Sequence, residues 1–379
     1  MRVAHVITSL TTGGAQTALY RIISATRRDG LVHSVVSLTD EGTFGSRLAT
    51  EGVPVTCLGM RPGVPDPRAV ARLVGLLRRE PPSLIQSWMY HANLVAGVAA
   101  LLTRTPIVWS IRHSDVDPRH GKRLTHLTNT VCARLSGFIP ARIVCCAESA
   151  AQSHRRLGYR ANRLVVIPNG FDVGRFVKDQ EAGFQVRAEL SIPREAMVVG
   201  HLARFHPDKD HETMLAAAHL VIEARDAFFC LAGDDVEWSN PVLSARIDAL
   251  GIRSRVRLLG ARRDVPELLS AMDVLASSSR SEAFPQVLGE AMSCGVPCVA
   301  TDCGDSREVV GPAGRIVPTR DPVALSRAIL DLLGLTLDER AALGAAARAR
   351  ICERYELGVV GRQYESLYAE VASRGVARS

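Results

Sequence analysis

Two glutamates, Glu282 and Glu290, lie eight residues apart in the segment SEAFPQVLGEAMSCGVPCVAT at 281–301. The apolar end of this segment predicts a buried strand, and residues 286–294 predict a helix. Pro285 suits the first turn of that helix, where its missing N–H leaves no hydrogen bond unmade. Glu282 is then expected in the loop before the helix, with Glu290 about one turn inside it. The free N–H groups at a helix start bind anions, so the segment predicts a site for an anionic ligand that also carries hydroxyl groups.

Two cations end another predicted strand, in the segment VVGHLARFHPDKDHETML at 198–215. Arg204 and Lys209 stand five residues apart in a short loop that precedes a helix. Arginine offers a planar fork of donors and lysine a compact charge, so the pair can bind different oxygens of a diphosphate. Taken alone, such a pair is more typical of two solvated cations on a protein surface.

The two segments together point to one ligand. Because ligands of parallel sheets bind outside the carboxyl ends of the strands, both segments are expected to converge there. A nucleotide-diphosphate sugar has a group for each side chain. Its diphosphate suits Arg204, Lys209 and the N–H groups near 284–287. Its ribose hydroxyls can donate to Glu290, and its sugar hydroxyls can donate to Glu282.

Short apolar runs alternate with helical stretches along most of the 379 residues, which predicts an α/β fold with parallel sheets covered by helices on both faces. The first series of predicted strands is Val3–Thr8, His33–Leu38, Val53–Leu58, Leu84–Trp88, Ile107–Ile111, Ile143–Cys146 and Leu164–Ile167. The second series is Val198–Ala203, Phe228–Ala232, Val256–Leu259, Val274–Ser277 and Pro297–Thr301. The break between them predicts two doubly wound, Rossmann-like domains that face a central cleft. The expected boundaries are a first domain at 1–172, a charged linker at 173–195, a second domain at 196–352, and a C-terminal helix at 353–379 that packs back across the cleft.

Composition narrows the class of protein. The chain is 47% hydrophobic and 22% charged, and it contains no run of 18 apolar residues, so we expect a globular protein without a membrane-spanning helix. The start, MRVAHVITSL, predicts a strand rather than a secretory signal. Nine scattered cysteines without a C-x-x-C pair predict reduced thiols and no metal site. These features favour the cytoplasm.

Several segments together match the pattern of a known family. They are Gly13-Gly14, IPNGFD at 167–172, ARFHPDK at 203–209, LAGDD at 231–235, and the block 258–302 that contains both glutamates. On these segments the chain resembles glycosyltransferase family 4, the retaining transferases with the GT-B fold, over essentially its whole length. The resemblance implies an acceptor-binding first domain and a second domain that binds a nucleotide sugar. It also implies transfer of a hexose-type sugar to a hydroxyl acceptor, with retention and without a metal or other cofactor.

The resemblance also implies the site. The expected substrate-binding residues are Gly13, Gly14, Arg204, Lys209, Ala283, Phe284, Pro285, Gln286, Val287 and Glu290. Glu282 is expected beside the transferred sugar, which it would orient, and the departing phosphate is expected to act as the base. The chain departs from the family at Ala283, where a glycine is usual, and at CGDSREVV (303–310), where many members have a second glycine.

A histidine is expected on the acceptor side. His113 follows the fifth predicted strand, where the family often places one, and a near-neutral pKa would let it shuttle or polarise a proton. A purely structural His113 and a role for His91 both remain open. Asp115-Val116-Asp117 forms a D-x-D pattern, but its position before Pro118 is typical of a turn, and we expect no metal there.

Other functions fit the sequence less well. A GT-B-like phosphorylase would need a lysine placed for pyridoxal phosphate, and a nucleotide-sugar epimerase an extra carboxylate in the first half; neither is evident. A periplasmic sugar-binding protein would need a signal peptide, and nucleic-acid binding would need a recognition motif or an aromatic platform.

Charge is concentrated in the first half. Residues 1–172 hold 21 Lys and Arg against 10 Asp and Glu, whereas the remaining residues hold 25 against 29. Within 104–163 there are 11 basic residues and three acidic ones. This pattern predicts peripheral contact with the anionic inner face of a membrane and a lipid-linked glycan acceptor. A solvated, arginine-rich surface is the simpler alternative.

Overall fold

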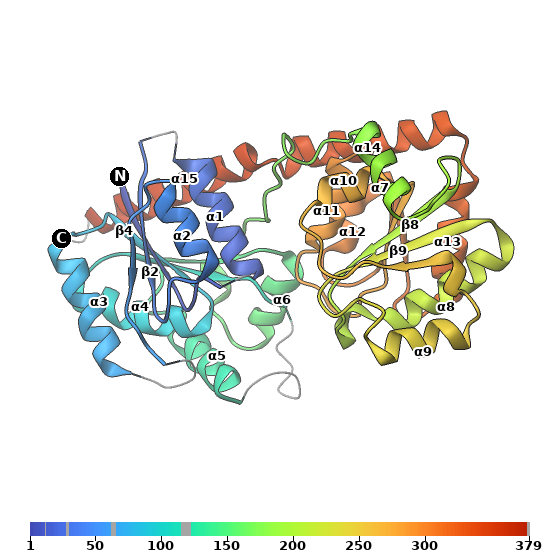
Figure 1. Ribbon diagram of the computed structural model, residues 1–379. Coiled ribbons are helices and arrows are strands. Elements are labelled where there is room, and N and C mark those ends of the chain that lie inside the picture. Colours follow the sequence, from blue (N-terminus) through green and yellow to red (C-terminus); the bar gives the residue numbers. More distant parts are fainter. Residues whose placement is uncertain (12, 28–29, 62–65, 115–122, 377–379) are drawn as a thin grey trace. The chain divides into compact units, whose positions relative to one another are not determined.

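The computed structural model describes the chain except residues 12, 28–29, 62–65, 115–122 and 377–379 (Figure 1). The chain divides into two compact units. The first unit is Met1–Gly170 together with Leu357–Ser379, and the second is Phe171–Glu356. Each unit contains one parallel sheet with helices packed on it, so the predicted α/β class is confirmed.

The first sheet has seven strands in the order β3-β2-β1-β4-β5-β6-β7. All its pairs are parallel. Every residue of the central strands β4 and β5 is buried, as expected for strands covered on both faces. The strands are β1 (Arg2–Ile7), β2 (Val32–Ser37), β3 (Val55–Cys57), β4 (Leu84–Trp88), β5 (Ile107–Ile111), β6 (Arg142–Cys145) and β7 (Leu164–Val166).

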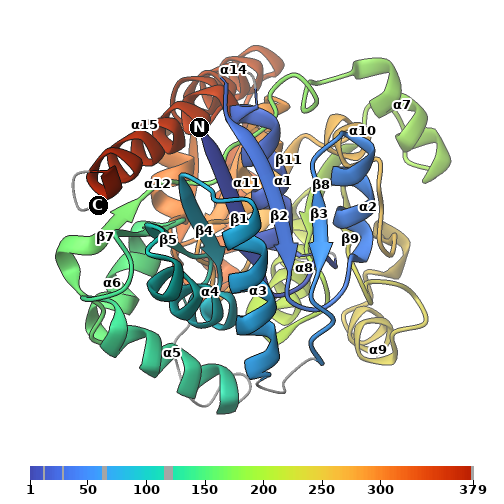
Figure 2. The ribbon, with the colours of Figure 1, turned by 90° about the vertical axis from the view of Figure 1, so that its left-hand side faces the viewer.

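The helices of the first unit form two groups. In one group α1 packs against both α2 and α15, and in the other α4 packs between α3 and α5 (Figure 2). The helices are α1 (Gly14–Thr26), α2 (Gly42–Thr50), α3 (Pro67–Arg79), α4 (Tyr90–Thr103), α5 (Arg123–Leu135), α6 (Glu148–Arg156) and α15 (Leu357–Val376), with a short 3-10 turn, η1 (Ala161–Arg163), before β7.

The second sheet has six parallel strands in the order β10-β9-β8-β11-β12-β13. The strands are β8 (Met197–Leu202), β9 (Ala227–Ala232), β10 (Val256–Leu258), β11 (Val274–Ser277), β12 (Cys298–Thr301) and β13 (Gly314–Val317). The helices are α7 (Gln180–Glu189), α8 (His211–Ala224), α9 (Pro241–Ala249), α10 (Val265–Ser270), α11 (Gln286–Ser293), α12 (Ser306–Val310), α13 (Pro322–Gly334) and α14 (Leu337–Arg354). Three 3-10 turns, η2 (Pro207–Lys209), η3 (Arg253–Arg255) and η4 (Gly311–Ala313), lie between them.

The structure differs from the sequence-based expectation at three places. β13 was not predicted; it is short and carries an exposed Arg315, so its hydrophobic signal is weak. Residues 173–195, expected as a linker, contain α7, which packs against α10 within the second unit. The helix expected at 353–379 is broken at Tyr355, whose carbonyl accepts a 2.8 Å hydrogen bond from Phe171 N.

The C-terminal helix α15 belongs to the first unit. Its apolar side chains recur three and four residues apart, and they join the same hydrophobic core as α1. Tyr368 also donates a buried hydrogen bond to Gln86 of β4. The chain therefore leaves the first unit after Gly170 and returns to it at Leu357.

Candidate functional site

The loop between β11 and α11, together with α11 itself, carries the two glutamates as predicted. α11 starts at Gln286, with Pro285 immediately before it, so Glu282 lies in the loop and Glu290 in the helix. Phe284 fixes the loop: its ring stacks on Phe171 at a centroid distance of 5.9 Å and meets Tyr355 edge-on at 5.7 Å.

The loop after β8 carries the two cations. Ala203 N donates to Ala232 O over 2.8 Å, which ties the end of β8 to the end of β9. The next loop residue on the β9 side must be glycine, because a Cβ on Gly233 would lie 2.2 Å from the carbonyl oxygen of Ala203. Arg204 is exposed in this loop, and Lys209 is half-buried in η2.

A cavity of about 440 Å³ lies at the carboxyl ends of the second sheet's strands. It brings together seven residues that the sequence predicted for the site: Arg204, Lys209, Glu282, Phe284, Gln286, Val287 and Glu290. Two predicted residues of the same loop, Ala283 and Pro285, do not line it. The carbonyl oxygen of Ala283 instead accepts a 3.0 Å hydrogen bond from Asp305 N.

Lys209 and Glu282 contact each other within this cavity. The ammonium group of Lys209 forms an ion pair with Oε1 of Glu282, and Ser279 Oγ donates to the same oxygen over 2.8 Å. In contrast, Arg204 forms no ion pair with any described residue, so its guanidinium is available to an anion.

Arg262 lines the same cavity and was missed by the sequence analysis. It pairs with Glu189 and Asp264, each at 2.6 Å, and these hydrogen bonds raise the pKa of its guanidinium further. Its charge is thus already balanced by two carboxylates. Its position just after β10, in GARRDV, is the signal that could have found it.

The apolar part of the cavity was also missed. Small or aliphatic side chains from β8, β9, α10 and the loops after β8 and β10 line it: Leu202, Ala203, Ala232, Ala261, Val265 and Leu268. They give the cavity a surface on which a flat, weakly polar group such as a nucleobase can pack.

The remaining predicted residues belong to the first unit. Gly13 precedes α1 and Gly14 begins it; a Cβ on Gly13 would lie 2.6 Å from Oε1 of Gln16. His113 is exposed just after β5, and His91 is half-buried, with its pKa lowered by burial. Asp115 and Asp117 lie outside the described residues.

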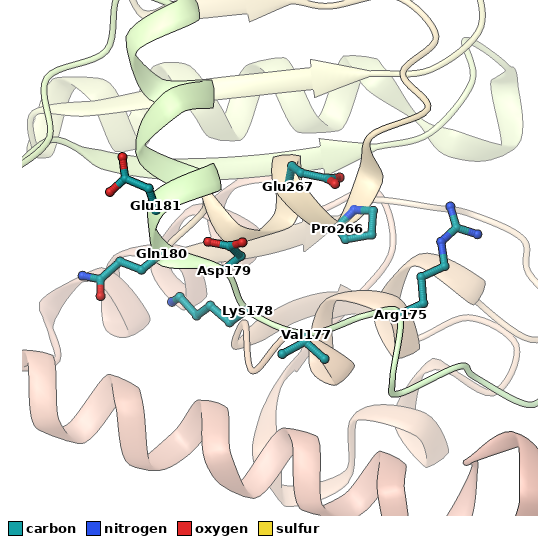
Figure 3. A pocket seen from close by; sticks show the side chains of 8 residues that line it. All are labelled: Arg175, Val177, Lys178, Asp179, Gln180, Glu181, Pro266 and Glu267. Carbon is teal, nitrogen blue, oxygen red and sulfur yellow. The ribbon is translucent and has the colours of Figure 1, made fainter.

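A second cavity of about 540 Å³ lies elsewhere in the second unit, between the start of α7 and the start of α10 (Figure 3). Its lining is largely charged and includes Arg175, Lys178, Asp179, Glu181 and Glu267. No predicted site residue lines it. In the described part of the chain, no group of three His, Cys, Asp or Glu side chains is placed to hold a metal ion.

Two family profiles together match most of the chain. The family profile Glycosyltransferase Family 4 matches residues 12–175, and the profile Glycosyl transferases group 1 matches residues 196–334. An N-acetyl-alpha-D-glucosaminyl L-malate synthase of Bacillus anthracis is 30% identical over 49% of this chain and 49% of its own length. A UDP-Gal:alpha-D-GlcNAc-diphosphoundecaprenol alpha-1,3-galactosyltransferase of Escherichia coli is 24% identical over 66% of this chain and 65% of its own length. The chain therefore spans about half the length of the first relative and just under two thirds of the second.

Solved structures match over nearly the whole chain. The crystal structure of Anabaena Alr3699/HepE in complex with UDP has a TM-score of 0.86 and 25% identity, covering 98% of this chain and 100% of that one. The same protein in complex with UDP-glucose has a TM-score of 0.82 at 25% identity, covering 97% and 100%.

Two Rossmann-like parallel sheets in separate units, with a cation-lined and carboxylate-lined cavity at the strand ends of the second, define a GT-B protein. The profile matches in both units place the chain in glycosyltransferase family 4. None of its described helices is both long and apolar enough to cross a bilayer.

Proposed function

We propose that this protein transfers a hexose-type sugar from a uridine-diphosphate sugar to a hydroxyl acceptor, with retention at the anomeric carbon. The observation that carries the proposal is the cavity of the second unit, where Arg204, Lys209, Glu282 and Glu290 converge. They are the four side chains that the sequence singled out for a diphosphate, a sugar and a ribose.

The donor's diphosphate is assigned to Arg204, Lys209 and the first turn of α11. Gln286 and Val287 of that turn line the cavity, and first-turn N–H groups lack intrahelical acceptors. Each charge-assisted hydrogen bond contributes about 1.5–3 kcal/mol. Glu290 is assigned to the ribose hydroxyls and Glu282 to the sugar.

The reaction needs no side-chain nucleophile in this proposal. The acceptor hydroxyl attacks from the face that the diphosphate leaves, and the departing phosphate takes the proton. Arg204 and Lys209 stabilise the negative charge that develops on the leaving group, which is the main electrostatic contribution. His113 is assigned to the acceptor side, where it polarises a proton.

The uridine nucleotide is supported by the 25% identical Anabaena protein, which was solved with UDP and with UDP-glucose. The test is a thermal-shift series with UDP, GDP, ADP, CMP and dTDP. A nucleotide present at 100 times its Kd stabilises the protein by about 2.7 kcal/mol. UDP should give the largest shift; a larger shift with another nucleotide would overturn the choice of uridine, and no shift with any of them would overturn the donor site.

A lipid-linked glycan is the acceptor class that we propose. The Escherichia coli relative is named for a diphosphoundecaprenol acceptor. A Rhizobium meliloti relative, 27% identical over 76% of this chain and 73% of its own length, is a lipopolysaccharide core biosynthesis glycosyltransferase. Such acceptors would bring the enzyme to the inner face of an anionic membrane.

The first unit offers a surface for this contact. α4 contains no charged residue, and its last turn exposes Leu101 and Leu102 by 58% and 56%. Phe138, just after α5, is 84% exposed. α4 and α5 lead into the neighbouring strands β5 and β6, so these apolar side chains lie near the amino ends of the same two strands.

Exposed arginines frame these apolar side chains. Arg104 ends α4, Arg134 lies in the last turn of α5, and Arg160 N donates to Ser136 Oγ over 2.9 Å. We call the set Leu101, Leu102, Arg104, Arg134, Phe138 and Arg160 the Phe138 surface. Two copies of it would repel each other, whereas an anionic lipid headgroup layer matches its charge. Contact there leaves the strand ends that carry His113 free for an acceptor.

A further inference from the structure

Two loops supply the polar side chains of the donor cavity. The loop after β8 carries Lys209 and the loop after β11 carries Glu282, and β8 and β11 are neighbours in the sheet. Loops at neighbouring strand ends can shift relative to each other unless something joins them. The position of Lys209 relative to Glu282 therefore depends on the contacts between these two loops.

Hydrogen bonds to backbone carbonyl oxygens join the loops first. Ser278 Oγ donates to the carbonyl oxygens of Lys209 and Asp210, over 2.8 and 3.0 Å. Arg280 N donates to the carbonyl oxygen of Asp208 over 2.6 Å. Two residues of the loop after β11 thus donate to the carbonyl oxygens of three consecutive residues, 208–210, in the loop after β8.

An ion pair completes the junction. Arg280 Nη2 lies 2.6 Å from Oδ1 of Asp210, whose side chain is fully buried. Asp210 also accepts from Thr213 N and Thr213 Oγ1, over 3.3 and 2.7 Å, and so caps α8. Burial disfavours its charged form, but Arg280 and Thr213 outweigh that effect and hold the pKa of Asp210 below its ordinary value. Removing the partner of a buried charge is costly, so Arg280 is firmly held.

We propose that Arg280 is a positioning residue for the donor site: through Asp210 it fixes the loop that carries Lys209 against the loop that carries Glu282. Lys209 is the residue before Asp210, and Glu282 lies two residues after Arg280. Arg280 does not itself line the cavity. The inference rests on the proposed function, because it gives Arg280 a role in a site that this function defines.

The proposal has a quantitative consequence. Without the ion pair, the Lys209 ammonium and the Glu282 carboxylate lose their fixed separation, and a misplacement of about 1 Å in a catalytic site can lower the rate about 100-fold. R280M keeps an unbranched, apolar stem but removes the charge. We expect R280M to raise the donor KM and to lower kcat, with kcat/KM reduced about 10- to 100-fold. R280K retains a cation and should recover most of the loss.

The matched control is R255M. Arg255 pairs with Asp226 at the same distance of 2.6 Å, and its side chain is 36% exposed, against 33% for Arg280. It lies just before β10, at the opposite end of the sheet from the cavity. A variant that merely lost a surface ion pair should behave like R255M.

The experiment measures UDP affinity by calorimetry and steady-state kinetics with a UDP-sugar, together with thermal midpoints. Lower UDP affinity and kcat/KM in R280M, rescue in R280K, and unchanged values in R255M are the expected results. In the E282Q background, R280M should lower kcat/KM much less than it does in the wild type. The reason is that Arg280 acts by placing Lys209 against the Glu282 carboxylate, which E282Q has already removed. Equal UDP affinity and kinetics for R280M and R255M, or full additivity with E282Q, would overturn the positioning role while the donor site stands. Failure of the wild type to bind UDP would overturn both proposals.

Discussion

Lys209 and Glu282 form an ion pair inside the cavity of the second unit, and Ser279 donates a 2.8 Å hydrogen bond to the same carboxylate oxygen. Thr301 Oγ1 donates in turn to the carbonyl oxygen of Ser279 over 2.5 Å, so Ser279 is itself held. Glu282 therefore keeps one fixed donor when Lys209 turns to another anion. In the proposed function that anion is the donor's diphosphate, and the freed carboxylate lone pairs of Glu282 accept from the sugar.

Arg204→Ala should weaken binding of a nucleoside diphosphate by about 1.5–3 kcal/mol, the contribution of a charge-assisted hydrogen bond. Arg204 is exposed beside the cavity, and among the described residues no carboxylate pairs with its guanidinium. A ligand phosphate therefore interacts with the whole positive charge of Arg204. Calorimetry with UDP and with uridine checks this, because uridine affinity should hardly change. Arg263→Ala, an exposed arginine that does not line the cavity, is the control. Equal losses for UDP and uridine would contradict the assignment.

Glu290→Gln should raise the donor KM, because an amide accepts fewer hydrogen bonds from the two ribose hydroxyls than a carboxylate does. Glu267→Gln on α10, which lines the other cavity, is the matched control and should leave KM unchanged. A 2′,3′-dideoxy donor analogue isolates the contact. It should bind the wild type less tightly than the normal donor does, yet show little difference in affinity between wild type and Glu290→Gln. If replacing the normal donor by the analogue lowers affinity as much in Glu290→Gln as in the wild type, Glu290 is not the ribose ligand.

Acid should destabilise the first unit through His33. Trp88 Nε1 donates to His5 Nδ1, His5 Nε2 lies 3.0 Å from His33 Nδ1, and His33 Nε2 lies 3.0 Å from Thr26 Oγ1, which donates to Ile22 O. This chain of bonds needs both histidines neutral. Burial, followed by the charge of Arg27, lowers the pKa of His33 to about 4.

The sign of the pH effect follows from that pKa. Between pH 6.5 and about 4 the unfolded chain binds a proton at His33 and the folded chain does not, so His33 alone lowers the free energy of unfolding by about 1.4 kcal/mol per pH unit. Urea unfolding followed by tryptophan fluorescence at pH 7.5, 6.5, 5.5 and 4.5 measures the slope. His33→Gln should reduce the slope by about one proton. An unchanged slope in that variant would show that His33 does not resist protonation.

Much of the lining of the second unit's cavity could be predicted from sequence because its parts lie at strand ends. Pro285 after Glu282 and the apolar run after Glu290 locate α11, and ARFHPDK locates the loop of Arg204 and Lys209. Because the strands are parallel, both loops follow carboxyl strand ends and lie on the same side of the sheet. The ion pair of Lys209 with Glu282 could not be predicted, since side-chain partners across loops follow from the register of β8 and β11. The place of Arg262 in the cavity could not be predicted either, because it depends on a contact with Glu189, which is distant in sequence.

Two structural features had weak sequence signals. β13 is four residues long and has only two partly or fully buried aliphatic side chains, Ile316 and Val317, so nothing in its pattern distinguishes it from a loop. The break between α14 and α15 has no proline or glycine at Tyr355 or Glu356. It arises from tertiary contact, where Tyr355 is held by Phe284 and by Phe171 N.

The Phe138 surface should bind anionic vesicles. Phosphatidylglycerol-containing vesicles should co-sediment the protein at low salt and release it as salt rises, because each arginine near the surface contributes about 1 kcal/mol that ions screen. Phe138→Ser should weaken binding about five- to tenfold, since partial burial of the ring contributes on the order of 1 kcal/mol. Leu337 is a 77% exposed apolar residue of the second unit, so Leu337→Ser is the matched control and should bind vesicles as the wild type does.

Arg134→Gln should reduce the salt dependence of vesicle binding without changing the contribution of the Phe138 ring. Equal losses in Phe138→Ser and Leu337→Ser, binding that ignores lipid charge and ionic strength, or no binding at all would contradict membrane contact and favour a soluble acceptor.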